Sequence, residues 1–329
     1  MKNFLIIGGG LAGITLAHQL QERNLSFTIV DNHPNFNSSK VAAGFWNPVV
    51  YKRLTESYNA SILLPYLKEF YGKVERKLNI KFAVEVKQLR IFADREERNR
   101  FIDKALASEI SQYLDEDIVD SHDGVKSPHG LGIVTSTGKI DTITYLQESI
   151  NYFQKSNSVI ETTFEYDDLV INPDRIEYND EKYERIAFCE GYKAIDNPYF
   201  QDIKLKPTKG EALILEIPDL SQEYSITRGV SLIPLGENKF WLGSNYSWDD
   251  MTEEPTQKAK EELTAKLDKF LDCDYRIIDH QAGIRPAAHD RRPITKKSDV
   301  DDRLYILNGF GTKGVMYAPF YSGELVEMT

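Results

Sequence analysis

The sequence predicts an α/β protein with a discontinuous domain on a parallel sheet and an α+β domain with a mixed antiparallel sheet. A strand–turn–helix–strand pattern opens the chain, which is typical of parallel sheets. Near the middle, residues 231–234 and 239–243 flank a four-residue turn and indicate a hairpin, whose strands are antiparallel. With 329 residues, 41% of them hydrophobic, the chain is long enough to bury two cores.

The first 31 residues have the pattern of a β-α-β unit. Residues 4–7 are a continuous apolar run, as expected of a central strand that helices cover on both faces. Residues 11–20 follow a helical period, and residues 27–30 predict a second buried strand that ends at Asp31.

The remaining elements alternate between helices and strands. We expect residues 35–48 to form a loop, and a helix near Pro65 that this proline either kinks or divides in two. Asp141 is expected to cap a later helix. The other expected elements are strand 88–92, helix 95–110, strand 185–189, the hairpin, a helix through 259–271, strand 303–307, a glycine turn at 309–314 and a closing helix.

These patterns predict how the chain divides into domains. Residues 1–80, 141–195 and 281–329 are assigned to the first domain, and residues 81–140 and 196–280 to the second. We expect the active site between them.

Composition narrows the classes of partner and site. The formal net charge of −11 disfavours a nucleic acid as the main partner, because such binding depends on neutralising phosphates. Cys189 and Cys273 have no metal or redox spacing, and the spacing of His280 and His289 suits neither a strand face nor a helix turn, so no metal site is expected. No apolar run approaches the roughly 18 residues of a membrane helix, and we expect a cytoplasmic protein.

Residues 8–13, GGGLAG, match the dinucleotide-binding pattern G-x-G-x-x-G between a predicted strand and a predicted helix. The glycines permit a tight turn, a close approach to a pyrophosphate and close packing of helix on strand, while the helix N-terminus offers free N–H groups. The first domain is therefore predicted to be of the Rossmann type. The residues expected at the dinucleotide from this unit are Gly8, Gly10, Leu11, Ala12, Gly13, Asp31 and Asn32.

The pattern alone does not distinguish NAD from FAD. A second G-x-G-x-x-G for a separate nicotinamide domain is missing, and two later glycine-bearing segments have the composition of ligand-facing turns. Both observations favour FAD. Around residues 132–138 the spacing of a phosphate-binding P-loop is not met, so phosphoryl transfer is not supported.

Three further segments carry a family resemblance: SSKVAAGFWNP at 38–48, AGIRP at 282–286 and GFGTKGVMYAP at 309–319. Together with the N-terminal pattern they resemble the FAD-dependent D-amino acid oxidase family, in the expected order and over essentially the whole chain. That family includes glycine and sarcosine oxidases and the oxidase half of a bacterial tRNA-modifying enzyme.

The resemblance implies further contacts to a non-covalently bound FAD. By that resemblance two serines meet the pyrophosphate, and two small-residue segments and a strand end lie against the flavin. These residues are Ser38, Ser39, Ala43, Gly44, Phe45, Gly191, Gly311, Thr312, Lys313, Gly314, Val315 and Met316.

Arg285 matches the substrate-facing arginine of the family's G-x-R-P, whose planar fork holds a carboxylate by two hydrogen bonds. Lys313 and Tyr246 are the other catalytic candidates, for a contact to substrate or oxygen. The chain departs from the amino acid oxidases at Ser231, where a tyrosine is expected to share the carboxylate. This departure puts a simple α-amino acid in doubt.

The resulting hypothesis is an oxidoreductase that oxidises a small amine or amino-acid-like substrate by hydride transfer to the flavin. Two alternatives stay open: an oxidase acting on a modified nucleoside of tRNA, and a flavin-binding protein without turnover. The first is disfavoured by the net charge and by the lack of a fused methyltransferase domain.

Overall fold

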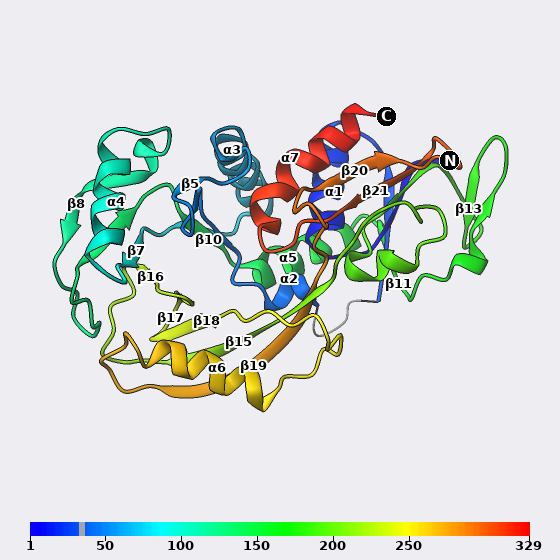
Figure 1. The fold of residues 1–329 in the computed structure, drawn as a ribbon. Coiled ribbons are helices and arrows are strands. Elements are labelled where there is room, and N and C mark those ends of the chain that lie inside the picture. Colours follow the sequence, from blue (N-terminus) through cyan, green and yellow to red (C-terminus); the bar gives the residue numbers. More distant parts are fainter. Residues whose placement is uncertain (33–36) are drawn as a thin grey trace.

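The computed structural model describes residues 1–32 and 37–329. Figure 1 shows one sheet on the side of the two chain ends and a second, long sheet on the side of α6. The first sheet has the order β11 (Val159–Glu161), β2 (Phe27–Asp31), β1 (Lys2–Ile7), β14 (Glu181–Phe188), β13 (Ile176–Tyr178) and β12 (Val170–Ile171), with β21 (Leu304–Asn308) beside β14 and β20 (Ile294–Lys297) beside β21.

Strand β1 lies at the centre of the first sheet and is parallel to both β2 and β14. Phe4 and Ile6 point into a core formed with helices, whereas Leu5 and Ile7 point into a separate core on the other face. Burial on both faces explains the continuous apolar run. The helices that contribute to the first core include α1 (Leu11–Glu22), α3 (Ala60–Leu78), α5 (Thr142–Gln154) and α7 (Gly314–Glu327).

The second sheet combines antiparallel pairs with one parallel pair, β7 with β16. Its outer face packs on α6 (Gln257–Leu267), whose Leu263 and Leu267 are fully buried. The strand order is β19 (Arg276–Arg285), β15 (Thr208–Glu216), β18 (Lys239–Gly243), β17 (Ser231–Gly236), β16 (Ser225–Thr227), β7 (Gln88–Ile91), β9 (Leu131–Val134) and β8 (Leu114–Val119).

The remaining elements lie outside these two sheets. The two-residue strand β3 pairs with β10, and β10 pairs with β6. The elements are α2 (Ser38–Val41), β3 (Phe45–Trp46), β4 (Val49–Val50), β5 (Thr55–Glu56), β6 (Ala83–Glu85), α4 (Arg95–Leu106), β10 (Gly138–Ile140) and 3-10 helices at Ser111–Tyr113, Tyr166–Asp168 and Gly191–Asp196.

The predicted α/β fold class is confirmed, as are the opening β-α-β unit and the hairpin. At the hairpin turn Glu237 and Asn238 both have positive φ, which matches the right-handed twist of the strands. Asp141 caps α5 by accepting a hydrogen bond from the backbone N–H of Thr144 at 3.0 Å, as predicted.

One local prediction is wrong, and one alternative of another is excluded. The expected helix near Pro65 is present as α3 and continues through Pro65, so this proline does not divide it in two. Residues 35–48 are not all loop, because Asn37 accepts hydrogen bonds from the N–H groups of Ser39 and Lys40 and so starts α2. Residues 35 and 36 of this segment lie outside the described part of the chain.

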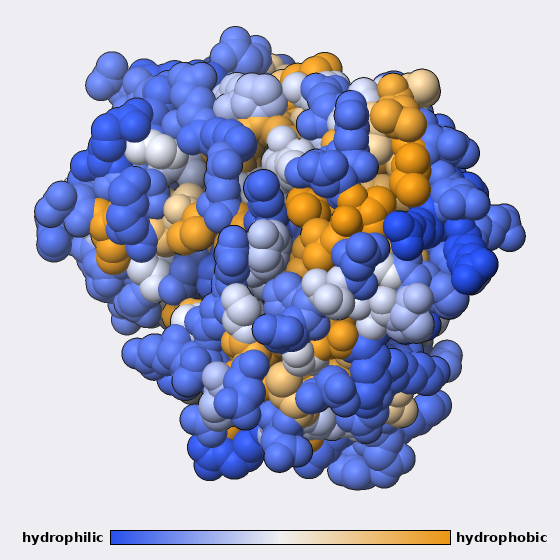
Figure 2. All heavy atoms as spheres, turned by 90° about the vertical axis from the view of Figure 1, so that its left-hand side faces the viewer, coloured by the Kyte–Doolittle hydropathy of each residue, from blue (hydrophilic) through white to orange (hydrophobic). Residues whose placement is uncertain are grey.

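The predicted domain division stays a prediction. Strand β19 pairs with β15 along its whole length, so the proposed boundary at 281 falls inside one strand of the second sheet. The face over α4 and β8 is mostly hydrophilic, with apolar residues in patches (Figure 2). Among residues 1–32 and 37–329, no helix is long and apolar enough to cross a membrane.

Candidate active site

A cavity of about 1030 Å³ is lined by residues of both large sheets. Nearly all of the predicted site residues line it. Those that do are Gly8, Gly10, Leu11, Ala12, Asp31, Asn32, Ser38, Ser39, Ala43, Gly44, Phe45, Gly191, Tyr246, Arg285, Gly311, Thr312, Lys313, Gly314 and Val315. Gly13 and Met316 do not line the cavity, because both are packed in the protein behind it.

Each glycine of the turn between β1 and α1 is required for a different steric reason. Gly8 has φ +103°, and a Cβ there would lie 2.4 Å from the carbonyl oxygen of Cys189. A Cβ on Gly13 would lie 1.9 Å from the carbonyl oxygen of Gly8, so this glycine lets α1 pack on the turn. A Cβ on Gly10 would meet only the Ser39 hydroxyl, at 3.4 Å, and would otherwise occupy the cavity.

Gly9 was not among the predicted site residues, yet it shapes the position of Asp31. A Cβ on Gly9 would lie 2.9 Å from the carboxyl carbon of Asp31. The carboxylate therefore sits against the glycine turn at the end of β2, where it can accept hydrogen bonds from a ribose. The Asn32 side chain beside it donates to the hydroxyl of Thr163 at 3.3 Å.

Two helix N-termini meet at the cavity. A Cβ on Gly314, the first residue of α7, would lie 2.8 Å from a methyl carbon of Leu11, the first residue of α1. The backbone N–H of Leu11 donates to the hydroxyl of Ser39 at 3.1 Å. Helix N-termini carry free N–H groups and a partial positive charge, so this end of the cavity suits an anionic group such as a pyrophosphate.

The backbone comes close to the cavity at two other predicted glycines. Gly44 has φ +64°, and a Cβ there would lie 1.9 Å from the carbonyl oxygen of Ile140, so only glycine allows β3 and β10 to meet. Gly191 has φ +60°, and nothing lies within 4 Å of the place where its Cβ would be. The Gly191 carbonyl is held by the side-chain amide of Asn308 at 2.8 Å. Together with the helix ends, these bare backbone walls fit a flat, elongated dinucleotide.

Lys313 immediately precedes α7 and is half-buried in the cavity wall. Its ammonium group donates to the carbonyl of Asn47 at 3.3 Å and to the hydroxyl of Ser57. Burial lowers the pKa of Lys313 to about 8. This lysine can therefore gain or lose a proton near neutral pH.

Arg285 ends β19 and lies flat over the neighbouring strand. A Cβ on Gly210 would be 1.6 Å from its Nη2 atom, so glycine makes room for the guanidinium. Nη2 donates to the Ser244 hydroxyl at 2.6 Å, and both terminal nitrogens donate to the carbonyl of Asn245 at 3.3–3.4 Å. The guanidinium carbon stands 4.8 Å from the centre of the Tyr246 ring. Its immediate partners are neutral, and burial lowers its pKa.

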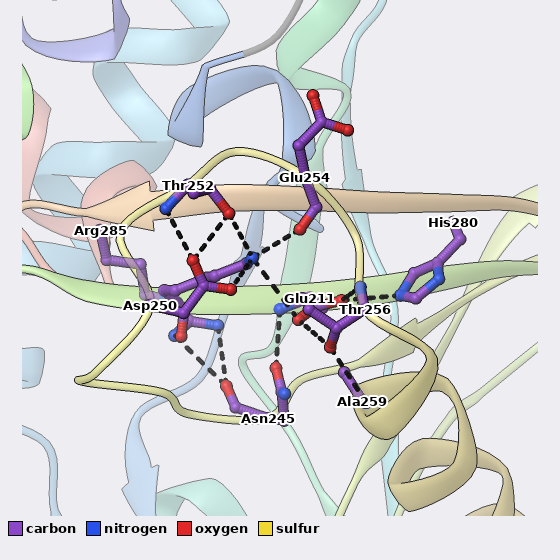
Figure 3. A network of polar contacts seen from close by, with 10 residues as sticks. Glu211, Asn245, Asp250, Thr252, Glu254, Thr256, Ala259, His280 and Arg285 are labelled. Atoms are coloured by element: carbon purple, nitrogen blue, oxygen red, sulfur yellow. Dashed lines mark hydrogen bonds and ion pairs between the residues drawn. The ribbon is translucent and has the colours of Figure 1, made fainter.

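A buried ion-pair network holds the segment 244–256 against β15. The ammonium of Lys209, which is 0% exposed, donates to Asp250 Oδ2 at 2.5 Å, to the Thr252 hydroxyl at 3.2 Å and to the Glu254 carbonyl at 2.5 Å. Figure 3 shows the Asp250 carboxylate, the Thr252 hydroxyl and the main-chain carbonyl of Glu254 gathered around one nitrogen, while the Glu254 carboxylate points away.

Glu211, on the same strand as Lys209, anchors the other end of this segment. Its carboxylate accepts from the backbone N–H of Thr256 at 2.6 Å and from the Thr256 hydroxyl at 2.8 Å, and lies 3.0 Å from Nε2 of His280. The backbone N–H of Glu211 donates to the Asn245 side chain at 2.8 Å, and Asn245 in turn accepts from Arg285 (Figure 3).

Sequence reasoning missed several polar residues of the cavity wall. Tyr51, Arg90 and Thr227 all line the cavity, but none belongs to a recognised motif. Trp241 also lines it and donates from its indole nitrogen to the carbonyl of Val41 at 3.0 Å. Alternation along the predicted hairpin could have placed Trp241 and Ser231 on the same face of the sheet. No local sequence signal identified Tyr51, Arg90 or Thr227.

Comparisons with known proteins agree with this site. A family model named DAO, FAD dependent oxidoreductase, matches residues 3–328. Among curated proteins, the tRNA 5-methylaminomethyl-2-thiouridine biosynthesis bifunctional protein MnmC of Marinobacter nauticus is 21% identical, over 98% of this chain and 54% of that protein. The chain thus spans about half the length of this relative.

Solved structures with the same fold include two oxidases. Glycine oxidase from Bacillus cereus superposes with a TM-score of 0.82 at 16% identity, covering 99% of this chain and 94% of that one. Iminodiacetate oxidase from Chelativorans sp. superposes with a TM-score of 0.78 at 16% identity, covering 99% and 95%. At these identities the likeness establishes the fold.

The family model matches nearly the whole chain, and FAD, the cofactor of that family, suits the paired helix ends and the glycine-lined cavity. The chain therefore belongs to the DAO family of FAD-dependent oxidoreductases.

Proposed function

We propose that this oxidoreductase acts on an amine that also carries a carboxylate, and that Arg285 holds the carboxylate. The observation that carries the proposal is the guanidinium at the cavity wall, half-buried and surrounded by a hydroxyl, two carbonyls and an aromatic ring. A half-buried cation with neutral neighbours attracts an anion more strongly than an exposed one, because less solvent screens it. Its planar fork suits a carboxylate.

The residues of this chain then have separate tasks. Bound FAD supplies the acceptor for the hydride that leaves the carbon next to the amine nitrogen. Arg285 fixes the orientation of the substrate, and positioning of this kind accounts for much of the rate in a reaction whose chemistry belongs to the cofactor. Lys313, with a pKa near 8, can hold or release a proton beside the turn that carries Gly311 and Gly314.

The test compares Arg285→Ala and Arg285→Lys on one carboxylate-bearing amine and on an amine of the same shape without the carboxylate. A charged hydrogen bond contributes about 1.5–3 kcal/mol, so losing the fork should lower kcat/KM at least about tenfold for the carboxylate substrate. Lysine should recover only part of this, because it offers a point charge in place of a fork.

Arg276→Ala is the matched control, since Arg276 begins the same strand and pairs with the exposed Glu216. Its kinetics should equal those of the unaltered protein. If Arg285→Ala slows both amines equally, Arg285 acts through the fold or the cofactor and the proposal is wrong.

A modified nucleoside of tRNA is the second candidate substrate. It is favoured by the match to the bifunctional tRNA-modifying protein over 98% of this chain, and opposed by the net charge of −11. Retention of tRNA that weakens steeply between 50 and 200 mM salt would support it. If neither amines nor tRNA reduce the flavin, the protein binds FAD without turnover. A cytoplasmic location remains a prediction.

A further inference from the structure

The hydroxyl of Ser244 is a polar group at the Arg285 end of the cavity that no sequence motif indicated. Ser244 directly follows β18, and Ser244 and Arg285 both line the cavity. Nη2 of Arg285 donates to the Ser244 hydroxyl oxygen at 2.6 Å. The other hydrogen bonds of this guanidinium within the described chain go to the carbonyl oxygens of Lys209 and Asn245 and measure 3.3–3.4 Å, which is long for an N–H···O bond. Ser244 is therefore the closest polar partner of Arg285.

This hydroxyl still has a proton to donate. A serine hydroxyl carries one donor and two acceptor lone pairs, whereas a guanidinium can only donate. The bond from Arg285 therefore occupies a lone pair of Ser244, and among residues 1–32 and 37–329 the Ser244 side chain has no second hydrogen-bond partner. Accepting from a cation also polarises the hydroxyl and makes it a stronger donor. Ser244 can thus offer its proton to an anion in the cavity that it lines.

The hydroxyl of Ser231 is engaged elsewhere, although the family resemblance leads us to expect a carboxylate-sharing tyrosine at this position. Ser231 stands opposite Gly243, the residue before Ser244. The Thr227 hydroxyl donates its proton to the carbonyl of Val230 at 3.2 Å. Thr227 can therefore only accept in its contact with the Ser231 hydroxyl, also at 3.2 Å, so Ser231 is the donor there. In this arrangement the proton of Ser231 is directed to Thr227 and away from the Arg285 site.

The residues after Ser244 hold it beside the guanidinium. The Asn245 side chain accepts from the backbone N–H of Glu211 at 2.8 Å, and the Asn245 carbonyl accepts from Arg285 (Figure 3). The centre of the Tyr246 ring lies 4.8 Å from the guanidinium carbon. The Ser244 hydroxyl is thus in place before a ligand binds, which reduces the entropy that binding has to overcome.

We propose that Ser244 donates its hydroxyl proton to one carboxylate oxygen of the substrate while Arg285 binds the same carboxylate. Ser244 is then a specificity-determining residue and has the part that the resemblance expects of a tyrosine at position 231. The inference rests on the proposed function, because it requires a carboxylate at Arg285. It adds that a guanidinium and a hydroxyl hold this anion together.

The test measures the affinity of the holoprotein for methoxyacetate, a carboxylate that carries no amine to oxidise, by titration calorimetry. Ser244→Ala should weaken the affinity at least about tenfold, the effect of one hydrogen bond to a charged group. Ser244→Cys has nearly the same size but a weak donor and should lose about as much, whereas Ser244→Thr keeps the hydroxyl and should stay within about threefold. If Ser244→Ala and Ser244→Cys retain their flavin and bind methoxyacetate as tightly as the unaltered protein, the proposal is wrong.

Ser247→Ala is the matched control. Ser247 belongs to the same segment and pairs with Lys209 through its backbone, which the substitution keeps. Its affinity for methoxyacetate should equal that of the unaltered protein. A loss as large as that of Ser244→Ala would show that the segment as a whole, and not the Ser244 hydroxyl, determines the affinity.

A double variant separates direct donation from an effect through Arg285. Ser244→Ala is combined with Arg285→Lys, which keeps a cation at the site. If the Ser244 hydroxyl bonds the carboxylate itself, its removal should still weaken binding at least about threefold in this background. If its removal changes nothing there, Ser244 only orients the guanidinium and the proposal is overturned.

The same measurements distinguish this inference from the proposed function. If Arg285→Ala binds methoxyacetate as tightly as the unaltered protein, the carboxylate site itself is wrong. If Arg285→Ala loses affinity but Ser244→Ala does not, only the role of Ser244 is excluded. With sarcosine as substrate, Ser244→Ala should raise KM at least about tenfold and change kcat less than about threefold, because the bond to the carboxylate is the same in the bound substrate and in the transition state. A lower kcat with an unchanged KM would contradict this role.

Discussion

Replacing Lys209 with methionine tests whether the buried ion pair holds the segment 244–256. Methionine fills a similar volume but removes three hydrogen bonds, to Asp250, Thr252 and the Glu254 carbonyl. Removing one partner of a buried ion pair costs about 3–5 kcal/mol. The Asp250 side chain is 34% exposed and can regain water, so we expect the lower end, about 3 kcal/mol.

This free energy translates into a measurable change of melting temperature. An unfolding entropy of about 2.1 cal/mol/K per residue gives roughly 0.7 kcal/mol/K for the whole chain, so the expected decrease is about 4 °C. Asp250→Asn keeps an acceptor oxygen and should lose less. Because the segment carries Ser244 and Asn245 against Arg285, Lys209→Met should also raise KM for a carboxylate substrate more than it lowers kcat.

Thermal unfolding followed by circular dichroism provides the assay, with Lys239→Met as the control. Lys239 forms an exposed pair with Glu237 on the hairpin, and its removal should change the melting temperature by less than about 1 °C. If Lys209→Met melts at the same temperature as this control, the ion pair does not hold the segment and the reasoning fails.

Three other predictions follow from single residues of the site. Gly10→Val should fold but lose FAD, because the valine side chain would enter the cavity. Gly13→Val should fail to fold, because its Cβ would strike the Gly8 carbonyl. The flavin content and the circular dichroism of both variants test these two expectations. Because burial lowers the pKa of Lys313 from 10.5 to about 8, the unfolded chain binds more protons than the folded one between these pH values. The stability of the unaltered protein relative to Lys313→Met should therefore rise with pH across that window, and a pH-independent difference in melting temperature would contradict it. Acid precipitation should release intact FAD into the supernatant; flavin that stays in the pellet would show a covalent link.

The parts of the fold that were predictable depend on local signals. The strands, glycine turn and helix of the opening unit lie within the first 31 residues, and Gly13 is required for a local reason, because a Cβ there would meet the Gly8 carbonyl. Arg285 and Lys313 were predicted as site residues because they lie in sequence motifs that resemble those of the family, and both line the same cavity.

Other features depend on pairing between distant segments and carry no local signal. Arg90 and Thr227 face the cavity only because β7 pairs with β16, whose residues are more than 130 positions away. Lys209 meets Asp250 only through the path of the segment after β18. The boundary predicted at 281 stays a prediction; it falls within β19, which pairs with β15 on both sides of that position.

Anaerobic reduction of the bound flavin by a carboxylate-bearing amine tests the central claim most directly. The holoprotein is mixed without oxygen with sarcosine and with an amine of the same shape that lacks the carboxylate, and the visible absorbance of the flavin is followed. The account predicts bleaching by sarcosine and slow or no bleaching by the amine without the carboxylate. Flavin that dithionite bleaches but none of these amines reduces would contradict it.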